Sequence, residues 1–226
     1  MAEIKVLKNI LEANLQTAEE NRRRLKEKGI FCLNIISSPG AGKTSILEKT
    51  IAGLCYTFRF ACIVGDIAGE HDALRLAALG VPAIQINTEG GCHLSASMVK
   101  KALEELVLDK IDILAIENVG NLVCPADFDL GEDMKIAVLS TPEGDDKPSK
   151  YPVIFSEARA VLINKADLLE IIDFNLDRAI ADIRKINPEA QIFEVSAKTG
   201  QGFIEWFNWF KKKVFEAKGQ NHKTSG

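Results

Sequence analysis

Short continuous apolar runs alternate along this chain with segments of helical periodicity, and this alternation most constrains the fold. Strands that are apolar on both faces and separated by helices are typical of a parallel sheet covered on both sides. We therefore predict an α/β fold with a doubly wound, mostly parallel sheet. The expected strands are 31–37, 60–65, 83–87, 111–117, 135–140, 160–164 and 191–195, and the expected helices between and after them are 43–54, 72–79, 94–108, 175–186 and 201–217.

The chain begins with a segment, residues 3–28, whose apolar residues recur at helical spacing. Its basic C-terminal end suits the helix dipole, and Gly29 is placed to end the helix. We predict a helical arm over residues 1–29 packed on one α/β domain at 30–217, followed by a flexible tail at 218–226. The stretch 141–152 is rich in turn-forming residues and is expected to be a loop.

The composition is that of an ordinary globular protein, because 46% of the 226 residues are hydrophobic and the net charge is −4. The chain lacks the basic character of a general nucleic-acid binder, and no apolar run approaches the roughly 18 residues of a membrane span. Its polar first residues do not resemble a signal peptide. We therefore expect a cytoplasmic protein with reduced cysteines that binds neither nucleic acid nor membrane.

The first expected strand runs into the sequence SSPGAGKT, residues 37–44, and then into a helix. This matches the phosphate-loop pattern G-x-x-x-x-G-K-S/T, except that Ser37 stands where the first glycine usually lies. In such loops, a lysine neutralises the β- and γ-phosphate oxygens and a hydroxyl binds Mg²⁺. The predicted phosphate contacts are Gly40, Ala41, Gly42, Lys43, Thr44 and Ser45.

Acidic residues follow two further expected strands. Glu117 and Asp66 each come at the end of an apolar run, and Asp72 lies six residues beyond Asp66. The carboxyl ends of parallel strands meet at one edge of a sheet, and Mg²⁺ prefers oxygen ligands. We predict Mg²⁺ ligands among Thr44, Asp66 and Glu117, and catalytic roles for Lys43, Asp72 and Glu117. The sequence does not divide Mg²⁺ binding and water positioning between the two aspartates.

Two short sequences at the ends of later strands match the base-binding elements of GTPases: NKAD at 164–167 and SAK at 196–198. A carboxylate at Asp167 accepts hydrogen bonds from N1–H and the 2-amino group of guanine, a donor pair that adenine lacks. The order of these elements after the phosphate loop favours GTP and GDP as ligands. The predicted base contacts are Asn164, Lys165, Asp167, Ser196, Ala197 and Lys198.

Cys92 and His93 are adjacent and follow two glycines, and Cys124 lies just beyond the strand that ends in Glu117. Neighbouring residues on a strand point to opposite faces, so this pair shares a metal only where the chain turns, which the glycines permit. Thiolate and imidazole suit Zn²⁺, Ni²⁺ or Cu⁺ better than Mg²⁺ or Ca²⁺. The remaining cysteines, in apolar segments, are expected to be small core residues: Cys32, Cys55 and Cys62.

The combination of motifs closely resembles the nickel-incorporation GTPases of nickel–iron hydrogenase maturation, the hydrogenase accessory protein HypB family. The resemblance covers residues from about 30 to 215. The segments that carry it are SSPGAGKT, GDIAGEHDALR, GGCHLSASMV, ENVGNLVCPADFDLGE and NKAD. The Cys-His pair together with the N-L-V-C-P segment is specific to this family.

The resemblance implies a P-loop GTPase fold of the SIMIBI type, slow GTP hydrolysis and a homodimer promoted by GTP. It implies that Cys92, His93 and Cys124 bind Ni²⁺ or Zn²⁺. Its implied partners are a small zinc- or nickel-containing metallochaperone and the precursor of the hydrogenase large subunit. The chain departs from many members at Gly69, where a hydroxyl residue is frequent, and has neither a cysteine-rich N-terminal site nor a histidine-rich stretch. Nickel storage is therefore not expected.

Two alternatives remain at this point. A small-molecule kinase uses the same phosphate-loop scaffold, although the NKAD and SAK sequences argue against it. A passive metal-binding chaperone with a vestigial nucleotide site is opposed by the intact Lys43, Thr44 and Asp167.

Overall fold

The structure is a computed structural model that describes residues 2–67 and 69–221, with side chains for residues 11–67 and 69–219. Within these residues all seven expected strands form, and they pair in parallel in the order β3-β2-β4-β1-β5-β6-β7. The doubly wound α/β fold is thus confirmed, with a wholly parallel sheet. The strands are β1 (Phe31–Ser37), β2 (Phe60–Asp66), β3 (Ala83–Asn87), β4 (Ile113–Glu117), β5 (Met134–Ser140), β6 (Ala160–Asn164) and β7 (Gln191–Glu194).

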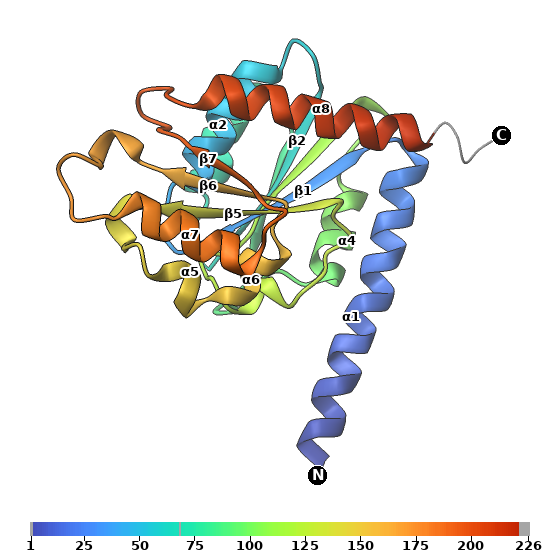
Figure 1. The fold of residues 1–226 in the computed structure, drawn as a ribbon. Coiled ribbons are helices and arrows are strands. Elements are labelled where there is room, and N and C mark those ends of the chain that lie inside the picture. The colour runs from blue at the N-terminus through green and yellow to red at the C-terminus, as the bar shows by residue number, and fades with distance from the viewer. Residues whose placement is uncertain (1, 68, 222–226) are drawn as a thin grey trace.

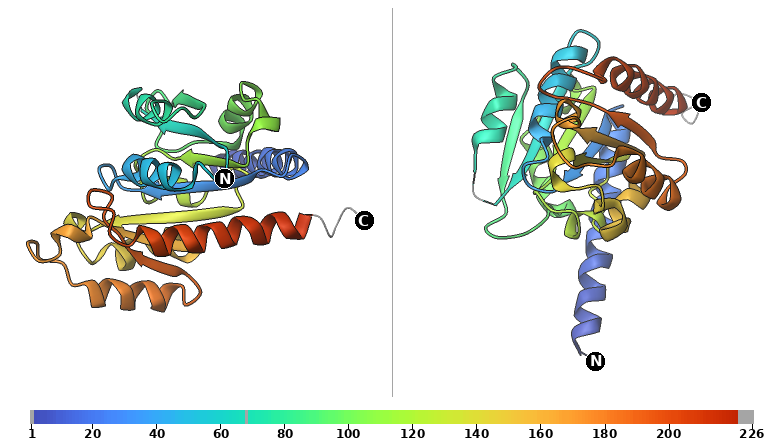
Figure 2. Two further views of the ribbon diagram at one scale, coloured as in Figure 1. Left: turned by 90° about the horizontal axis from the view of Figure 1, so that it is seen from above. Right: turned by 60° about the vertical axis from the view of Figure 1, so that its left-hand side comes forward.

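Helices cover both faces of the sheet (Figure 1 and Figure 2). Helices α2, α3 and α8 pack on one face, and α1, α4, α6 and α7 contribute to the apolar clusters on the other. The helices are α1 (Ala2–Glu27), α2 (Lys43–Leu54), α3 (His71–Ala77), α4 (Ala96–Glu104), α5 (Lys147–Lys150), α6 (Pro152–Glu157), α7 (Leu176–Ile186) and α8 (Phe203–Asn221), with 3₁₀ turns at Leu108–Lys110, Cys124–Ala126, Thr141–Glu143 and Ala166–Leu168.

The register of the strands brings their carboxyl ends to one edge of the sheet. Glu117, the last residue of β4, pairs with Ile35 of β1 on one side and Val64 of β2 on the other. On the other half of the sheet, Ser140 of β5 pairs with Asn164 of β6. Each chemistry-bearing loop leaves the sheet at this edge, where ligands of open α/β folds bind.

Among residues 11–27 of α1, whose side chains the structure describes, burial increases toward the C-terminal end. Ala18, Asn21 and Leu25 are buried, whereas Leu11 and Leu15 are 37% and 54% exposed. Figure 1 shows the N-terminal end of α1 projecting beyond the sheet and its neighbouring helices. The helix itself is confirmed, while the division of the chain into an arm and a domain at residue 29 stays a prediction.

The structure differs from the expectations most clearly in two segments and at one cysteine, and the expected helix 94–108 is shorter, at Ala96–Glu104. The stretch 141–152 contains a 3₁₀ turn and helix α5, and α6 follows it directly. Pro148 and Pro152 stand in the first turns of these helices, where a missing N–H is tolerated. Helix α8 continues to Asn221, so residues 218–221 of the expected tail are helical, and residues 222–226 lie outside the described residues.

Cys55 is the third difference, because it is exposed rather than part of the core. It caps the C-terminus of α2 and is rotated away from the buried Leu54 that precedes it. Cys32 and Cys62 are fully buried, as expected.

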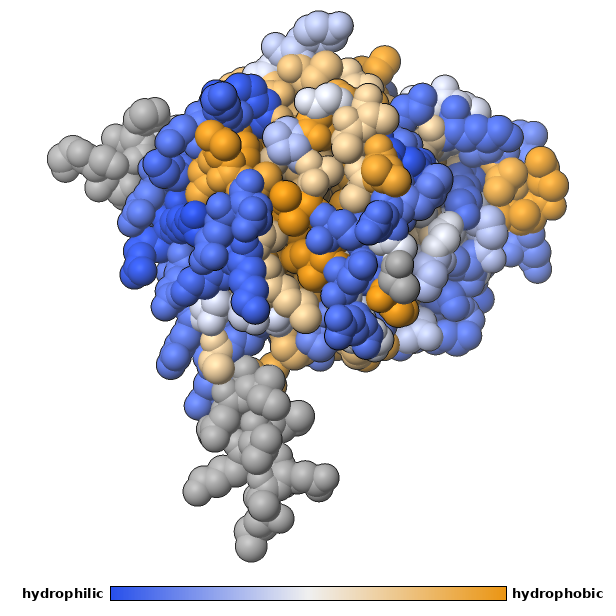
Figure 3. Space-filling view, turned by 180° about the vertical axis from the view of Figure 1, so that it is seen from behind, coloured by the Kyte–Doolittle hydropathy of each residue, from blue (hydrophilic) through white to orange (hydrophobic). Residues whose placement is uncertain are grey.

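Seen from behind, polar and charged side chains surround a central band of apolar residues (Figure 3). None of the helices in the described part of the chain combines the length and apolar character needed to cross a bilayer.

Candidate functional site

The phosphate loop connects β1 to α2 and depends on two glycines with left-handed backbone. Gly40 and Gly42 have φ of 75° and 98°. A Cβ atom at Gly42 would lie 2.5 Å from Nδ2 of Asn164, so no larger residue fits there. The Asn164 amide in turn donates to the carbonyl of Ala41 at 2.8 Å. The loop is therefore shaped by its own backbone and held by the strand that carries the NKAD sequence.

Lys43 lies inside this loop rather than in solvent. Its side chain is 7% exposed, and its Nζ donates to the hydroxyl of Ser37 at 3.3 Å. Burial lowers the pKa of Lys43, while the nearby carboxylates of Glu117 and Asp72 oppose that effect. Ser37, the residue that departs from the usual glycine, is fully buried and donates its hydroxyl to Ser38 O at 2.7 Å.

Thr44 and Glu117, two of the predicted Mg²⁺ ligands, are in direct contact. The Thr44 hydroxyl donates to Oε1 of Glu117 at 2.9 Å. Glu117 is 3% exposed, and its second oxygen, Oε2, is buried without a hydrogen-bond partner. Burial raises the pKa of Glu117 to about 7 despite the opposing charge of Lys43. A hydroxyl beside a buried carboxylate with an unpartnered oxygen fits the donor preference of Mg²⁺.

The structure gives Asp66 and Asp72 other contacts. The Asp66 carboxylate accepts hydrogen bonds from the backbone of Ile67 and Gly69, at 2.7 and 3.1 Å. Asp72 accepts from Arg75 at 3.3 Å, and Arg75 also binds both carboxylate oxygens of Glu48. The charges of both aspartates favour the protonated form of Lys43, so both lie near the phosphate loop. Their roles in Mg²⁺ binding and catalysis stay predictions.

The base-binding elements line a cavity of about 280 Å³ beside the phosphate loop. Oδ1 of Asn164 accepts from Ala197 N at 3.1 Å, so this side chain joins the phosphate loop to the SAK segment. Lys165 has a left-handed backbone, and its Nζ donates to Gly40 O at 2.7 Å. The hydroxyl of Ser196 donates to Oδ1 of Asp167 at 2.6 Å. The cavity is lined by Gly42, Ser45, Asn164, Lys165, Asp167, Leu168, Ala197 and Lys198.

The cysteines and histidine predicted to bind metal lie together. One ligand atom each from Cys92, His93 and Cys124 falls within 4.8 Å of the other two. The turn needed for this arrangement follows β3, where Glu89 and Gly90 both have positive φ. Cys124 begins a 3₁₀ turn beyond β4 and is half-buried, as expected for a residue outside the core.

The pKa values of two residues in this cluster are shifted, and only the shift at His93 favours the metal-binding form. Burial lowers the pKa of His93, which favours the neutral imidazole that binds metals. The pKa of the Cys124 thiol is raised, chiefly by its hydrogen bond with Cys92. Two sulfur donors and one nitrogen donor fit Zn²⁺ or Ni²⁺ and leave a tetrahedral ion one ligand short.

Two further residues shape this cluster, and the sequence patterns did not reveal them. The ring of Phe128 stacks on His93 with centroids 3.8 Å apart. The fully buried Asn118 accepts at Oδ1 from Leu94 N at 3.1 Å and from Val119 N at 3.0 Å. It thereby joins the residue after His93 to the loop after Glu117. An asparagine directly after an acidic strand end is the only local signal, because its partner is 24 residues away.

The comparisons with known proteins agree with this geometry. The family model described as CobW/HypB/UreG, nucleotide-binding domain, matches residues 31–194. The hydrogenase maturation factor HypB of Azotobacter chroococcum mcd 1 is 48% identical over 210 residues, which cover 93% of this chain and 69% of that protein.

Two crystal structures are similar over most of their length. HypB from Helicobacter pylori in complex with nickel is 43% identical, with a TM-score of 0.86, and the match covers 90% of this chain and 96% of that one. HypB from Archaeoglobus fulgidus is 39% identical, with a TM-score of 0.84, and the match covers 90% and 99%. The chain therefore belongs to the CobW/HypB/UreG family of P-loop nucleotide-binding proteins and, within it, to the hydrogenase maturation factors HypB.

Proposed function

We propose that this protein is a GTP-hydrolysing metallochaperone that regulates insertion of nickel into the large subunit of nickel–iron hydrogenase. One observation carries the proposal: the Cys92–His93–Cys124 cluster is linked through the buried Asn118 to the loop that follows Glu117. Movement at the γ-phosphate would reach the metal ligands through this short connection.

On the nucleotide side, Lys43 stabilises charge on the transferring phosphoryl group, and Asp167 selects guanine. Thr44 and Glu117, with Asp66 nearby, would hold Mg²⁺, which neutralises charge on the phosphate oxygens. No glutamine stands in the segment after Glu117, where fast GTPases position their water. We expect slow intrinsic hydrolysis for this reason, with Asp72 as a candidate for positioning water.

On the metal side, Ni²⁺ or Zn²⁺ is cargo rather than a reagent. A water molecule or a residue from a second copy would complete the three-ligand set. A two-fold symmetric homodimer formed with GTP would bring two such clusters together. The proposed partners are a small zinc- or nickel-containing metallochaperone and the hydrogenase large-subunit precursor, and the proposed compartment is the cytoplasm.

Metal titration of purified variants tests the cargo site. Cys92→Ala should remove most binding of nickel and zinc but leave GTP affinity unchanged, because no cysteine lines the base cavity. Cys55→Ala is the matched control, since Cys55 is exposed and outside the cluster. Equal metal affinity in the wild type and Cys92→Ala would overturn the proposed site. Absence of GTP turnover in metal-loaded protein would favour a passive metal chaperone.

A further inference from the structure

The proposed metal ligands come from two segments, one after β3 and one after β4, and α1 bonds to both. Asn14 of α1 accepts at Oδ1 from Ala96 N at 2.8 Å and donates through Nδ2 to Asp129 O at 2.7 Å. Ala96 lies three residues beyond His93, and Asp129 directly follows Phe128. One side chain therefore joins the two ligand-bearing segments.

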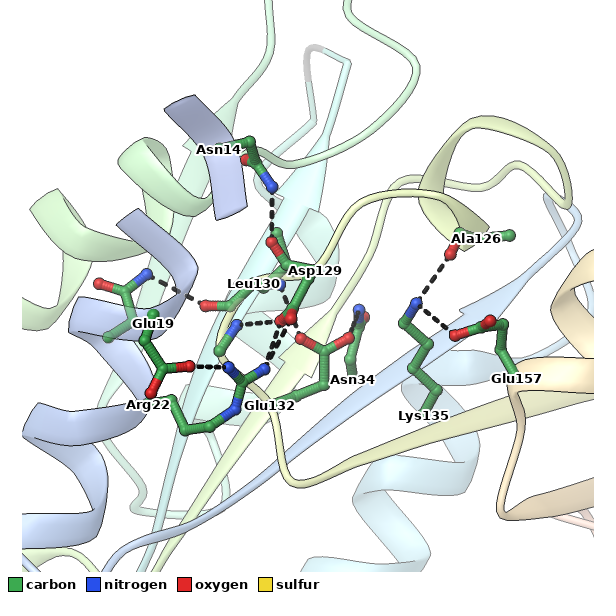
Figure 4. Close-up of polar contacts among 12 residues, drawn as sticks. Asn14, Glu19, Arg22, Asn34, Ala126, Asp129, Leu130, Glu132, Lys135 and Glu157 are labelled. Atoms are coloured by element: carbon green, nitrogen blue, oxygen red, sulfur yellow. Dashed lines mark hydrogen bonds and ion pairs between the residues drawn. The ribbon is translucent and has the colours of Figure 1, made fainter. Parts of the chain in front are cut away.

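Asn21, two turns further along α1, makes the same kind of bridge. Its Nδ2 donates to Ala96 O at 2.9 Å and to Leu130 O at 3.0 Å, and the residue is 1% exposed. Arg22 adds two bonds to the Asp129 carboxylate, at 2.8 and 2.7 Å. Figure 4 shows Asn14 and Arg22 converging on Asp129 from α1.

Close backbone contact fixes α1 against the second segment. A Cβ atom at Gly131 would lie 2.6 Å from Ala18 O and 2.8 Å from Arg22 N. Glu132 continues the network inward, because its carboxylate accepts from Asn34 at 3.1 Å. Asn34 in turn accepts from Asn118 at 3.2 Å. The segment after Cys124 is thus held from α1 on one side and from the core on the other.

We infer that Asn14 and Asn21 are positioning residues for the metal site: they set the separation between the Cys92–His93 segment and the Cys124–Phe128 segment. The inference rests on the proposed function of the cluster. Hydrogen-bonding groups behind metal ligands orient those ligands, and their loss lowers metal affinity without removing a ligand.

A simpler role for Asn14 is to cap the start of α4 through Ala96 N, and Asn14→Asp separates the two possibilities. The aspartate keeps the acceptor for Ala96 N and places negative charge near a helix N-terminus, which is favourable. It loses the donor to Asp129 O and leaves that bridge broken. A capping role predicts wild-type metal affinity for Asn14→Asp, whereas a bridging role predicts a loss similar to that of Asn14→Ala.

The experiment titrates zinc into the full chain with a competing chelator and measures GTP affinity and Tm in parallel. Asn14→Ala and Asn14→Asp should each lower zinc affinity by roughly tenfold to a hundredfold. Both should leave GTP affinity unchanged, because Asn14 is half-buried and does not line the base cavity. Gln16→Ala, on the exposed face of the same helix, is the control. Wild-type zinc affinity in Asn14→Asp would overturn the inference, whether or not Asn14→Ala loses affinity.

Hydrogen exchange gives an independent readout that needs no variant of the buried Asn21. By linkage, zinc binding to the wild type should slow exchange of the α1 amides around Asn14 and Asn21. Cys92→Ala should abolish this effect. If Cys92→Ala still binds zinc like the wild type, the proposed metal site is wrong. If Cys92→Ala loses zinc but zinc leaves α1 exchange unchanged in the wild type, only the positioning role is wrong.

Discussion

The candidate nucleotide site and the proposed metal site lie at the same edge of the sheet but are built differently. In the nucleotide site, buried side chains bond directly across strand ends, as Thr44 does to Glu117 and Asn164 does to Ala41 and Ala197. In the proposed metal site, three half-buried residues lie on two loops, and Cys92 contacts both His93 and Cys124.

The nucleotide site is preformed, whereas the proposed metal site depends on its neighbours. Phosphate binding needs donors fixed before the ligand arrives, and strand ends supply that rigidity. The separation of the proposed metal ligands depends on residues that contact their loops. Asn118 contacts the Cys92–His93 loop from the nucleotide site, and Asn14 contacts it from α1. We expect such a site to suit capture and release of a metal ion, because a change in the position of Asn118 or of α1 would alter metal affinity.

The largest effect on activity is expected from Lys43→Ala in the nucleotide site. Loss of the buried ammonium removes charge stabilisation of the transferring phosphoryl group and should reduce single-turnover GTP hydrolysis by about 1000-fold. Lys49→Ala, exposed on the same helix, is the control and should hydrolyse GTP like the wild type. Hydrolysis within tenfold of the wild type in Lys43→Ala would contradict the assigned role. Wild-type turnover above about 1 s⁻¹ without a partner would also contradict the expected slow rate.

Next in size is the effect of Asp167→Asn on base choice. The Asn amide oxygen can still accept from the hydroxyl of Ser196. The Asn amide nitrogen, however, is a donor where guanine needs an acceptor, and it suits the 2-oxo group of xanthine instead. GTP affinity should fall about 30-fold to 700-fold, equivalent to about 2–4 kcal/mol, and XTP affinity should rise. Fluorescent-nucleotide titration measures both, with the exposed Asp173→Asn as control. Unchanged GTP affinity would show that the cavity does not read guanine.

Coupling between the two sites is tested by measuring nickel affinity with GDP and with a non-hydrolysable GTP analogue. If the nucleotide state shifts the loop held by Asn118, the two affinities should differ by about 5-fold to 150-fold. Light scattering on the same samples should find a dimer with the analogue and a weaker dimer with GDP. Equal affinities and equal masses would mean that the two sites merely share a chain.

The smallest effect concerns stability and pH in the absence of nucleotide and Mg²⁺. Because the pKa of Glu117 is about 7 in the folded protein, the folded state binds more protons than the unfolded state between about pH 4.5 and 7. Stability from this group is therefore present in acid and lost as pH rises through 7. Glu117→Gln should raise Tm at pH 8 by about 2–8 °C and have little effect at pH 5.

Thermal melts at both pH values measure this difference, with the exposed Glu104→Gln as control. A lower Tm for Glu117→Gln at pH 8 would mean that the ionised carboxylate is stabilised by the folded site. Mg²⁺ and nucleotide should abolish the advantage of Glu117→Gln, because the carboxylate then has a cation to bind.

The sheet, its seven strands and the positions of the nucleotide motifs were predictable from the amino-acid sequence. Apolar periodicity reports burial along a local stretch of chain, so strands such as 31–37, 83–87 and 160–164 have the expected bounds. The left-handed backbone of Gly42 is also predictable from the sequence, because the phosphate-loop pattern requires a glycine at this position. Helices α5 and α6 were not predicted, since they have only four and six residues and carry prolines in their first turns.

The contacts that support the proposed metal ligands became visible only in the folded structure. Cys92 and Cys124 are 32 positions apart, and the contacts that place their segments come from Asn118 and from Asn14 and Asn21 on α1. Each of these asparagines looks locally like an ordinary polar residue. Its role arises from hydrogen bonds to backbone groups more than 20 residues away, which depend on how helices and loops pack and not on any local periodicity.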